Sequence, residues 1–226
     1  MKKLIIPDSE TIRKKVYAHV REQILSGRIA PNERLIETKI AQEIGTSRTP
    51  VREALHNLEI EGLIQSIPRV GYQVKAISAA EVEEICEIRS VIECLAARWA
   101  MEKAAPKVIR ELDKNITATM EKVAQGDVRA FVDLDAQFHE IIARCSGSTR
   151  LLEMSQTLRG HMLRYRVQSI FDEETVLQAL KGHQRILRAI EKGEAGDVSA
   201  AVQDHLEESK QSILRHALKK EEDMGK

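Results

Sequence analysis

Beyond residue 78 the sequence carries helical periodicity and no strand pattern, and this feature constrains the fold most strongly. Apolar side chains recur every three or four residues, a spacing that places them on one side of a helix. Glycine separates several of the periodic segments, and Pro106 opens one. Short connections favour helices that pack antiparallel to their neighbours. Residues 78–226 are therefore predicted to form an all-α antiparallel helical bundle, with helices over 79–104, 106–125, 127–146, 148–169, 172–192 and 195–219.

Residues 1–77 predict a smaller and different domain. A first helix is expected from residue 9 to 26, because Ile12, Val16, Val20 and Ile24 recur every four positions. A second helix is expected over 37–44, and a third follows Ser47, a suitable N-cap residue. Residues 62–66 and 72–74 are predicted strands joined by a turn at 68–71. Three helices plus a β-hairpin make a winged helix-turn-helix, so the fold class is mainly α.

Composition narrows the class of protein further. Aromatic residues make up 3% of the chain and no apolar run approaches the roughly 20 residues that span a bilayer, so we expect a cytoplasmic protein without a membrane partner. Cys86, Cys94 and Cys145 form no CxxC pair, which fits a reducing compartment. The zero net charge is unevenly divided: residues 1–77 carry 13 Lys+Arg and 9 Asp+Glu, and the remainder carries 22 and 26. A modestly basic first domain permits contact with phosphates without requiring it.

The third predicted helix gathers polar side chains at its N-terminal end: Ser47, Arg48, Thr49 and Arg52. A recognition helix presents this end to the DNA major groove, where an arginine can bond guanine O6 and N7 together. The predicted hairpin turn, with Arg69 and Gly71, could approach the adjacent backbone or minor groove. The pattern alone leaves a second interpretation open, a winged helix used for protein contacts.

These residues resemble the signature of the GntR family of bacterial regulators. The resemblance rests on four segments, of which Ser47–Leu55 is the most specific; the others are Gly27–Pro31, Glu33–Leu35 and Leu58–Leu63. It implies that Ser47, Arg48, Thr49 and Arg52 contact operator DNA and that Arg34 contacts backbone or base. Asn32 departs from the family's usual glycine, but asparagine tolerates the same turn conformation.

Histidines in the second domain raise the question of a metal. Asp135 and His139 are four residues apart, so both side chains point the same way from one helix. His183 and His205 lie on two later predicted helices. One carboxylate and three imidazoles suit a first-row divalent metal. By themselves, histidines at such positions are more often ordinary surface or core residues.

The second domain resembles the FCD subgroup, named for the FadR C-terminal domain. The match rests on Glu87-Ile88-Arg89, Glu93, Ala96-Ala97, the Asp135–His139 pair and the single histidines of the last two helices. It implies that Asp135, His139, His183 and His205 hold a divalent metal, with Zn²⁺ expected and Ni²⁺ or Mn²⁺ as alternatives, and that a small organic acid completes its coordination. Arg89 would then pair with the acid's carboxylate, or alternatively with Glu93 or Glu87 along its own helix.

We therefore expect a homodimeric, sequence-specific repressor whose operator affinity is controlled by a small carboxylate effector. One alternative keeps DNA binding but makes the metal purely structural, with no effector. Another is a metal-dependent hydrolase, since an open metal site could activate water. The sequence has no H-E-x-x-H motif and no glutamate clearly placed as a general base, so we expect no enzyme activity.

Overall fold

The computed structural model of the chain describes residues 11–25, 28–76, 78–169 and 173–224; the side chains of 128, 129, 163–169 and 216–224 lie outside that description. The chain divides into two compact units, Met1–Ala76 and Ile77–Lys226. The outer ends of the two predicted domains, and the residue at their boundary, lie outside the described residues.

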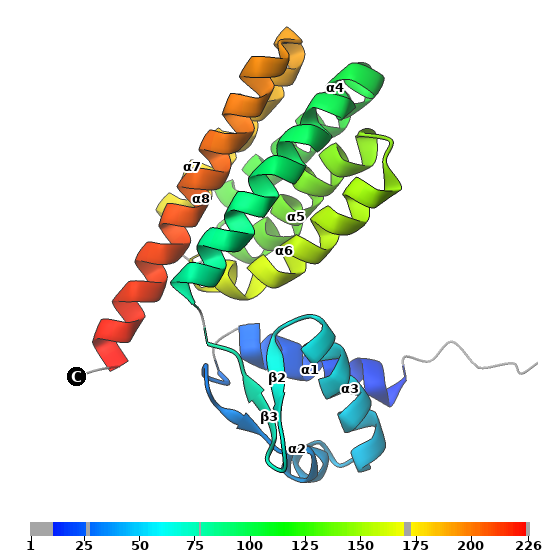
Figure 1. Cartoon of the computed structure of the whole chain (residues 1–226), viewed down its shortest axis with the longest axis vertical. Helices are drawn as coiled ribbons and strands as arrows, with labels where there is room; N and C mark the ends of the chain where they lie inside the picture. Colours follow the sequence, from blue (N-terminus) through cyan, green and yellow to red (C-terminus); the bar gives the residue numbers. More distant parts are fainter. Residues whose placement is uncertain (1–10, 26–27, 77, 170–172, 225–226) are drawn as a thin grey trace, which may run out of the picture. The chain divides into compact units, whose positions relative to one another are not determined.

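The first unit has the predicted winged helix-turn-helix architecture. Its helices are α1 (Ile12–Leu25), α2 (Glu37–Ile44) and α3 (Arg48–Ile60), and its strands are β1 (Arg34–Leu35), β2 (Ile64–Ile67) and β3 (Gly71–Val74) (Figure 1). The antiparallel sheet has the order β1-β3-β2. The strand β1 was not predicted, because two residues are too few to display the alternation by which a strand is recognised.

A single apolar core joins the helices and the sheet of this unit. The stripe of α1 formed by Val16, Val20 and Ile24 is buried, and the sheet adds Leu35, Ile64 and Val74. The buried face of α3 consists of the predicted residues Val51, Ala54, Leu55 and Leu58. Because the inner face of α3 is fully covered, its first turn is held in a fixed direction while its polar side chains face solvent.

Two backbone conformations shape the edges of this unit. Gly45 has φ 75° and ends α2 in the left-handed conformation, which only glycine adopts freely. Ser47 occupies the N-cap of α3 with extended backbone angles, but its side chain makes no capping hydrogen bond within the described structure. Gly71 has φ 124°, and a Cβ atom there would lie 2.9 Å from the carbonyl oxygen of Leu35. Gly71 therefore allows β3 to approach β1 closely.

The second unit is the predicted helical bundle. It consists of α4 (Ala79–Ala124), α5 (Val128–Cys145), α6 (Thr149–Ser169), α7 (Glu173–Lys192) and α8 (Ala195–Met224). The backbone of α4 leaves helical angles at Ala104, two residues before Pro106, so the predicted helices 79–104 and 106–125 meet at a kink. Proline removes a helical hydrogen bond and crowds the preceding turn, which explains the position of the kink.

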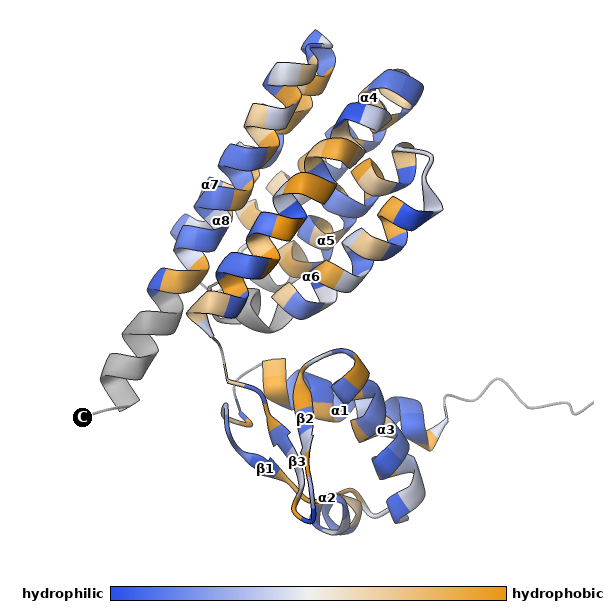
Figure 2. Cartoon of the chain, in the orientation of Figure 1, coloured by the Kyte–Doolittle hydropathy of each residue, from blue (hydrophilic) through white to orange (hydrophobic). Residues whose placement is uncertain are grey.

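The core of the bundle is aliphatic. Figure 2 shows mainly hydrophilic residues along the visible side of α8, and apolar residues alternating with hydrophilic ones along α4. The core contains, among others, Ala96, Ala100, Leu112, Phe138, Ile186, Ile190, Val198 and Val202. Small alanines on α4 let the neighbouring helices pack closely, which brings their polar side chains within reach of one another. Within the described segments, every helix is too short or too polar to cross a membrane.

Candidate DNA interface and metal centre

The side chains that the sequence assigned to DNA are exposed on the first unit. Ser47, Arg48, Thr49 and Arg52 lie at or in the first turns of α3. Arg34 is exposed on β1, and Arg69, with φ 65°, is exposed in the turn between β2 and β3. Gly71 begins β3 beside that turn and has the packing role described above. The arrangement offers guanidinium groups on α3, on β1 and at the hairpin turn.

Glu37, which sequence reasoning missed, joins the two arginines of α3. Arg52 donates from Nε to Oε1 of Glu37 at 2.9 Å and from Nη2 to Oε2 at 3.0 Å. Arg48 donates from Nη2 to Oε2 at 3.2 Å. These contacts, the hydrogen bond from Arg52 first, hold the pKa of Glu37 below its usual range. Nothing in the sequence shows that the first residue of α2 would meet a helix that begins eleven positions later.

The histidines of the second unit come together inside the bundle. His139 comes from α5, His183 from α7 and His205 from α8, and each is 4% exposed or less. One ring nitrogen from each lies within 4.8 Å of the other two; His139 Nε2 and His205 Nε2 are 3.4 Å apart. Two ligands of a tetrahedral Zn²⁺ at about 2.1 Å lie about 3.4 Å from each other. The three imidazoles therefore form a possible metal site.

Asp135 lies beside the three histidines and is also buried. Its Oδ1 atom is 3.4 Å from His183 Nε2 and 4.0 Å from His139 Nε2. All four residues that the sequence singled out for a metal are thus neighbours, although they come from three helices and span 70 positions. A carboxylate among three neutral imidazoles suits a divalent cation, because its negative charge would partly balance the ion.

A second layer of buried residues holds the histidine rings. The ring of Phe138 stacks on that of His183, with centroids 3.8 Å apart and planes at 6°. Glu93 Oε2 lies 2.8 Å from His139 Nδ1, so a proton on Nδ1 would point to Glu93 and leave Nε2 for a metal. Carboxylates commonly orient metal-binding histidines in this way. In the sequence, Glu93 follows Arg89 by four residues on an otherwise apolar helix face. The sequence did not show that Glu93 is buried, which is what brings it to His139.

Arg89 pairs with Glu93 and is 2% exposed. Its Nε and Nη2 atoms both lie 2.8 Å from Oε1 of Glu93. Burial by itself would raise the pKa of Glu93, but the charge of Arg89 and the contact with His139 outweigh burial and hold that pKa far below its ordinary value. Of the two partners proposed along the helix, Glu93 is thus the one Arg89 contacts, while Glu87 is exposed.

Gly182 is a second residue that sequence reasoning missed. A Cβ atom built on it would lie 2.4 Å from Nδ1 of His205 and 3.1 Å from Cγ of the same ring. The absence of a side chain on α7 therefore makes room for the imidazole from α8. A glycine inside an amphipathic helix costs about 1 kcal/mol relative to alanine and usually has a packing reason. A glycine inside the predicted helix 172–192 was therefore the feature of the sequence that could have indicated close packing at this position.

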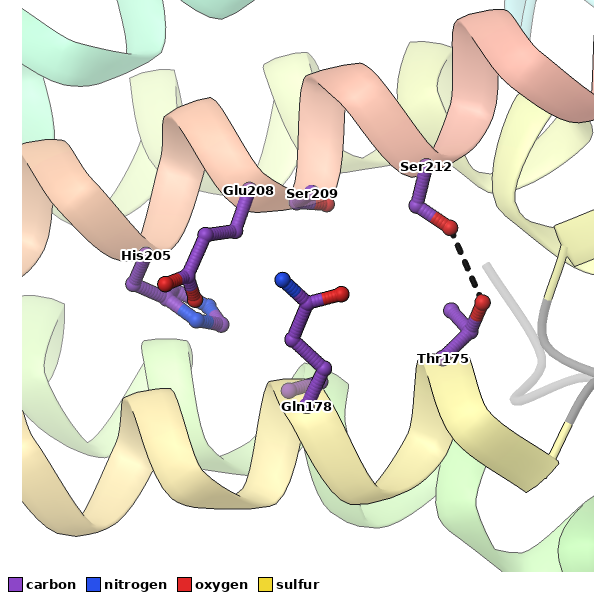
Figure 3. Close-up of a pocket in the computed structure, with 7 residues that line it drawn as sticks. Thr175, Gln178, His205, Glu208, Ser209 and Ser212 are labelled. Atoms are coloured by element: carbon purple, nitrogen blue, oxygen red, sulfur yellow. Dashed lines mark hydrogen bonds between the residues drawn. The ribbon is translucent and has the colours of Figure 1, made fainter.

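A small pocket between α7 and α8 is lined in part by His205. Figure 3 shows Gln178 directed into the space between the two helices, with Glu208 and Ser209 facing it from α8. At the far end, the hydroxyls of Thr175 and Ser212 are 2.9 Å apart and form a hydrogen bond. The pocket thus presents amide, hydroxyl and carboxylate groups next to one of the three histidines.

Comparison with known proteins gives two family matches. Residues 12–74 match the model described as "Bacterial regulatory proteins, gntR family", and residues 84–208 match the FCD domain. The HTH-type transcriptional repressor RspR of Escherichia coli is 28% identical over 205 residues, which cover 91% of this chain and 90% of that protein. A probable D-xylose utilization operon transcriptional repressor of Paenarthrobacter nicotinovorans is 28% identical over 196 residues, covering 87% and 86%.

Solved structures share the fold. The structure of E. coli McbR/YncC superposes with a TM-score of 0.73 at 20% identity, covering 92% of this chain and 99% of that one. A putative GntR transcriptional regulator from Rhodococcus sp. RHA1 gives the same TM-score at 21% identity, covering 89% and 97%. At this level of identity the likeness concerns the fold alone.

Proposed function

Because the chain belongs to the GntR family of DNA-binding transcription regulators and carries an FCD domain, we propose that it is a repressor whose operator affinity is controlled by a small organic acid. The matched relatives are regulators and not enzymes, so the hydrolase alternative is set aside. Repression is supported by the two relatives named as repressors. We place the protein in the cytoplasm, where its DNA target is.

The proposed metal site is Asp135, His139, His183 and His205, with Zn²⁺ as the expected ion and Ni²⁺ or Mn²⁺ as alternatives. The observation that carries this assignment is the burial of three imidazoles with ring nitrogens within 4.8 Å of one another. Neutral imidazole nitrogens are common ligands of first-row divalent metals. A divalent ion bound there would be held by the ring nitrogens and the carboxylate and would offer a coordination position to a carboxylate oxygen of the effector.

The effector is proposed to be a small carboxylate that ligates this metal. Arg89 is the proposed second contact, because its buried guanidinium is linked through Glu93 to His139, and a guanidinium has five N–H donors, more than one carboxylate oxygen can accept. A dicarboxylate or hydroxy acid would use both the metal and the arginine.

Operator DNA is proposed to contact Ser47, Arg48, Thr49 and Arg52 through the first turns of α3. Arg34 is proposed to contact its backbone or bases, and Arg69 and Gly71 its backbone or minor groove. The exposure of the five polar and charged side chains on α3 and β1 supports this assignment. One recognition helix reads only a few base pairs. The protein is therefore proposed to bind a palindrome as a homodimer, with half-sites about one helical turn apart.

The surface of α4 supports a dimer formed through the bundle. Val91 is 72% exposed and Ile88, one turn earlier, is 42% exposed; a second copy of the chain would cover both. Light scattering should give twice the 25.5 kDa chain mass for the wild-type protein. Val91→Asp should reduce the measured mass towards that of one chain. A wild-type monomer that persists on DNA would contradict the proposal.

Two measurements on the purified protein test the regulatory proposal together. Elemental analysis should find about one divalent ion per chain, and a mobility-shift assay on the gene's own upstream region should show release of DNA by at least one member of a set of small carboxylates. Metal-stripped protein should still bind DNA but lose this response. A tightly held metal without any response to carboxylates would favour the purely structural metal. Protein that has no metal and gains no thermal stability from added Zn²⁺, Ni²⁺ or Mn²⁺ would refute the site.

A further inference from the structure

The carboxylate of Glu37 lies between the two arginines assigned to the major groove. We propose that Glu37 is a specificity-determining residue: it holds Arg48 and Arg52 in one orientation, and its charge weakens binding to DNA through phosphates alone. This inference rests on the proposed contacts of both arginines with operator DNA.

The first step concerns orientation. The Glu37 side chain is 16% exposed, whereas those of Arg48 and Arg52 are each 59% exposed. Glu37 is the first residue of α2 and lies two positions after β1, so both neighbouring elements fix its backbone. The two-bond contact with Arg52 sets the plane of that guanidinium as well as its position. The less mobile carboxylate therefore restricts two long side chains that would otherwise sample many rotamers.

The second step concerns charge. Arg48 and Arg52 are four residues apart on one face of α3, and together they would attract any phosphate backbone. Glu37 reduces the net charge of the group from +2 to +1, which lowers the affinity for every DNA sequence alike. A guanidinium held at one edge can still offer its remaining N–H donors to guanine. On an operator with guanines in the right places, these oriented donors offset part of the loss, whereas non-operator DNA bears all of it, so the ratio of the two affinities rises.

Two substitutions separate charge from orientation. Glu37→Gln removes the charge and keeps nearly the same shape; Glu37→Asp keeps the charge but withdraws the carboxylate by one methylene. Glu43→Gln is the matched control, because Glu43 lies on the same helix, is 62% exposed and has only a 3.9 Å contact with Lys39 among the described ion pairs. The probes are a duplex that the wild-type protein selects from a random library and a scrambled duplex of the same composition, both titrated by fluorescence anisotropy at several salt concentrations.

Glu37→Gln should bind the scrambled duplex about 3- to 10-fold more tightly at low salt, with a salt dependence steeper by about one ion per half-site. Its affinity for the selected duplex should rise less or fall, so that the specificity ratio drops about 2- to 10-fold. Glu37→Asp should leave binding to the scrambled duplex unchanged and weaken binding to the selected one. Glu43→Gln should raise affinity for the scrambled duplex by less than Glu37→Gln and keep the ratio.

The inference is overturned if Glu37→Gln weakens both duplexes equally, which would make Glu37 a residue of structural support, or if it behaves like Glu43→Gln. Circular dichroism and the melting temperature would reveal a folding defect in Glu37→Gln. In that case Glu37→Asp tests the role of orientation, because it keeps the charge. Alanine at Arg48 and Arg52 separates the two proposals. If these variants keep wild-type affinity, the proposed DNA contacts fail; if they lose affinity while Glu37→Gln changes nothing, only the inference about Glu37 fails.

Discussion

The two candidate sites of this chain are constructed in opposite ways. The side chains assigned to the major groove come from six consecutive positions, 47–52, and are exposed. Those assigned to the metal come from three helices between Asp135 and His205, and all are buried. Exposed guanidinium groups remain solvated, so one helix whose apolar face is packed against the core is enough to present them. Buried imidazoles lose their water and depend on partners from distant parts of the chain. The first site should therefore tolerate changes in the bundle, and the second should not.

The largest effect is expected from Arg52→Ala, which should weaken operator binding by about 30-fold or more. A bidentate base contact is worth about 1–3 kcal/mol, and a dimer loses two. The measurement is anisotropy on the selected duplex. Lys39→Ala is the control: this substitution removes the same charge, and Lys39 is 74% exposed on α2. Metal content and melting temperature should stay unchanged in both variants. Equal losses for Arg52→Ala and Lys39→Ala would mean that charge alone accounts for binding.

His183→Ala should act on the other site only. Metal affinity should fall by more than the roughly 10- to 100-fold that is typical of losing an outer-sphere partner, because an alanine supplies no coordinate bond. With free metal at 100 to 1,000 times the dissociation constant, wild-type protein should be about 3–4 kcal/mol more stable than its metal-free form, and the variant should lose this gain.

The control for His183→Ala is His161→Ala in α6, a histidine outside the cluster. Both variants should bind operator DNA, and only His183→Ala should lose the response to carboxylates. If both bind metal like the wild type, the site at His183 is wrong. A loss of DNA binding in His183→Ala alone would show that the two sites are less independent than their construction implies.

Gly182→Ala tests whether the metal site depends on packing as well as on ligands. All four proposed ligands remain, but the new Cβ would meet the His205 ring at 2.4 Å, so metal affinity should fall about 10- to 100-fold. Gly160→Ala in α6 is the control, because nothing lies within 4 Å of its Cβ; it should keep metal affinity and gain about 0.5–1 kcal/mol of stability. Isothermal titration with Zn²⁺ measures both. Unchanged affinity in Gly182→Ala would mean that α7 and α8 move apart without cost to the site.

The smallest effect concerns the core of the DNA-binding unit at alkaline pH. The Tyr17 hydroxyl donates to Glu61 at 2.6 Å; burial, and then this bond, raise the pKa of Tyr17 to about 12. An unfolded tyrosine ionises near pH 10, so the contribution of Tyr17 is complete below pH 10 and is lost as the pH rises from 10 to 12. Wild-type stability in urea should therefore fall more steeply over this range than that of Tyr17→Phe. Parallel curves would show that Tyr17 titrates normally in the folded protein.

Sequence reasoning reached the local features of both regions. The helix over Glu37–Ile44 and the buried stripe of α3 follow from spacing alone, because an amphipathic helix must turn its apolar side inward. Pro106 located the break in α4 for an equally local reason. The four-residue spacing of Asp135 and His139 places both on one helix face. The prediction that they lie close to His183 and His205 rested on a family resemblance.

The sequence by itself determined which segments are helical, which faces of them are apolar and which short motif carries the arginines of α3, because these properties depend on neighbours within about four residues. The tertiary structure alone decided that Glu37 lies between those arginines, that Glu93 meets His139, and that Gly182 makes room for His205. Each of these relations joins side chains whose meeting depends on how buried surfaces fit together in space. Close packing selects that fit from the volumes of all the residues involved, and no local pattern records it.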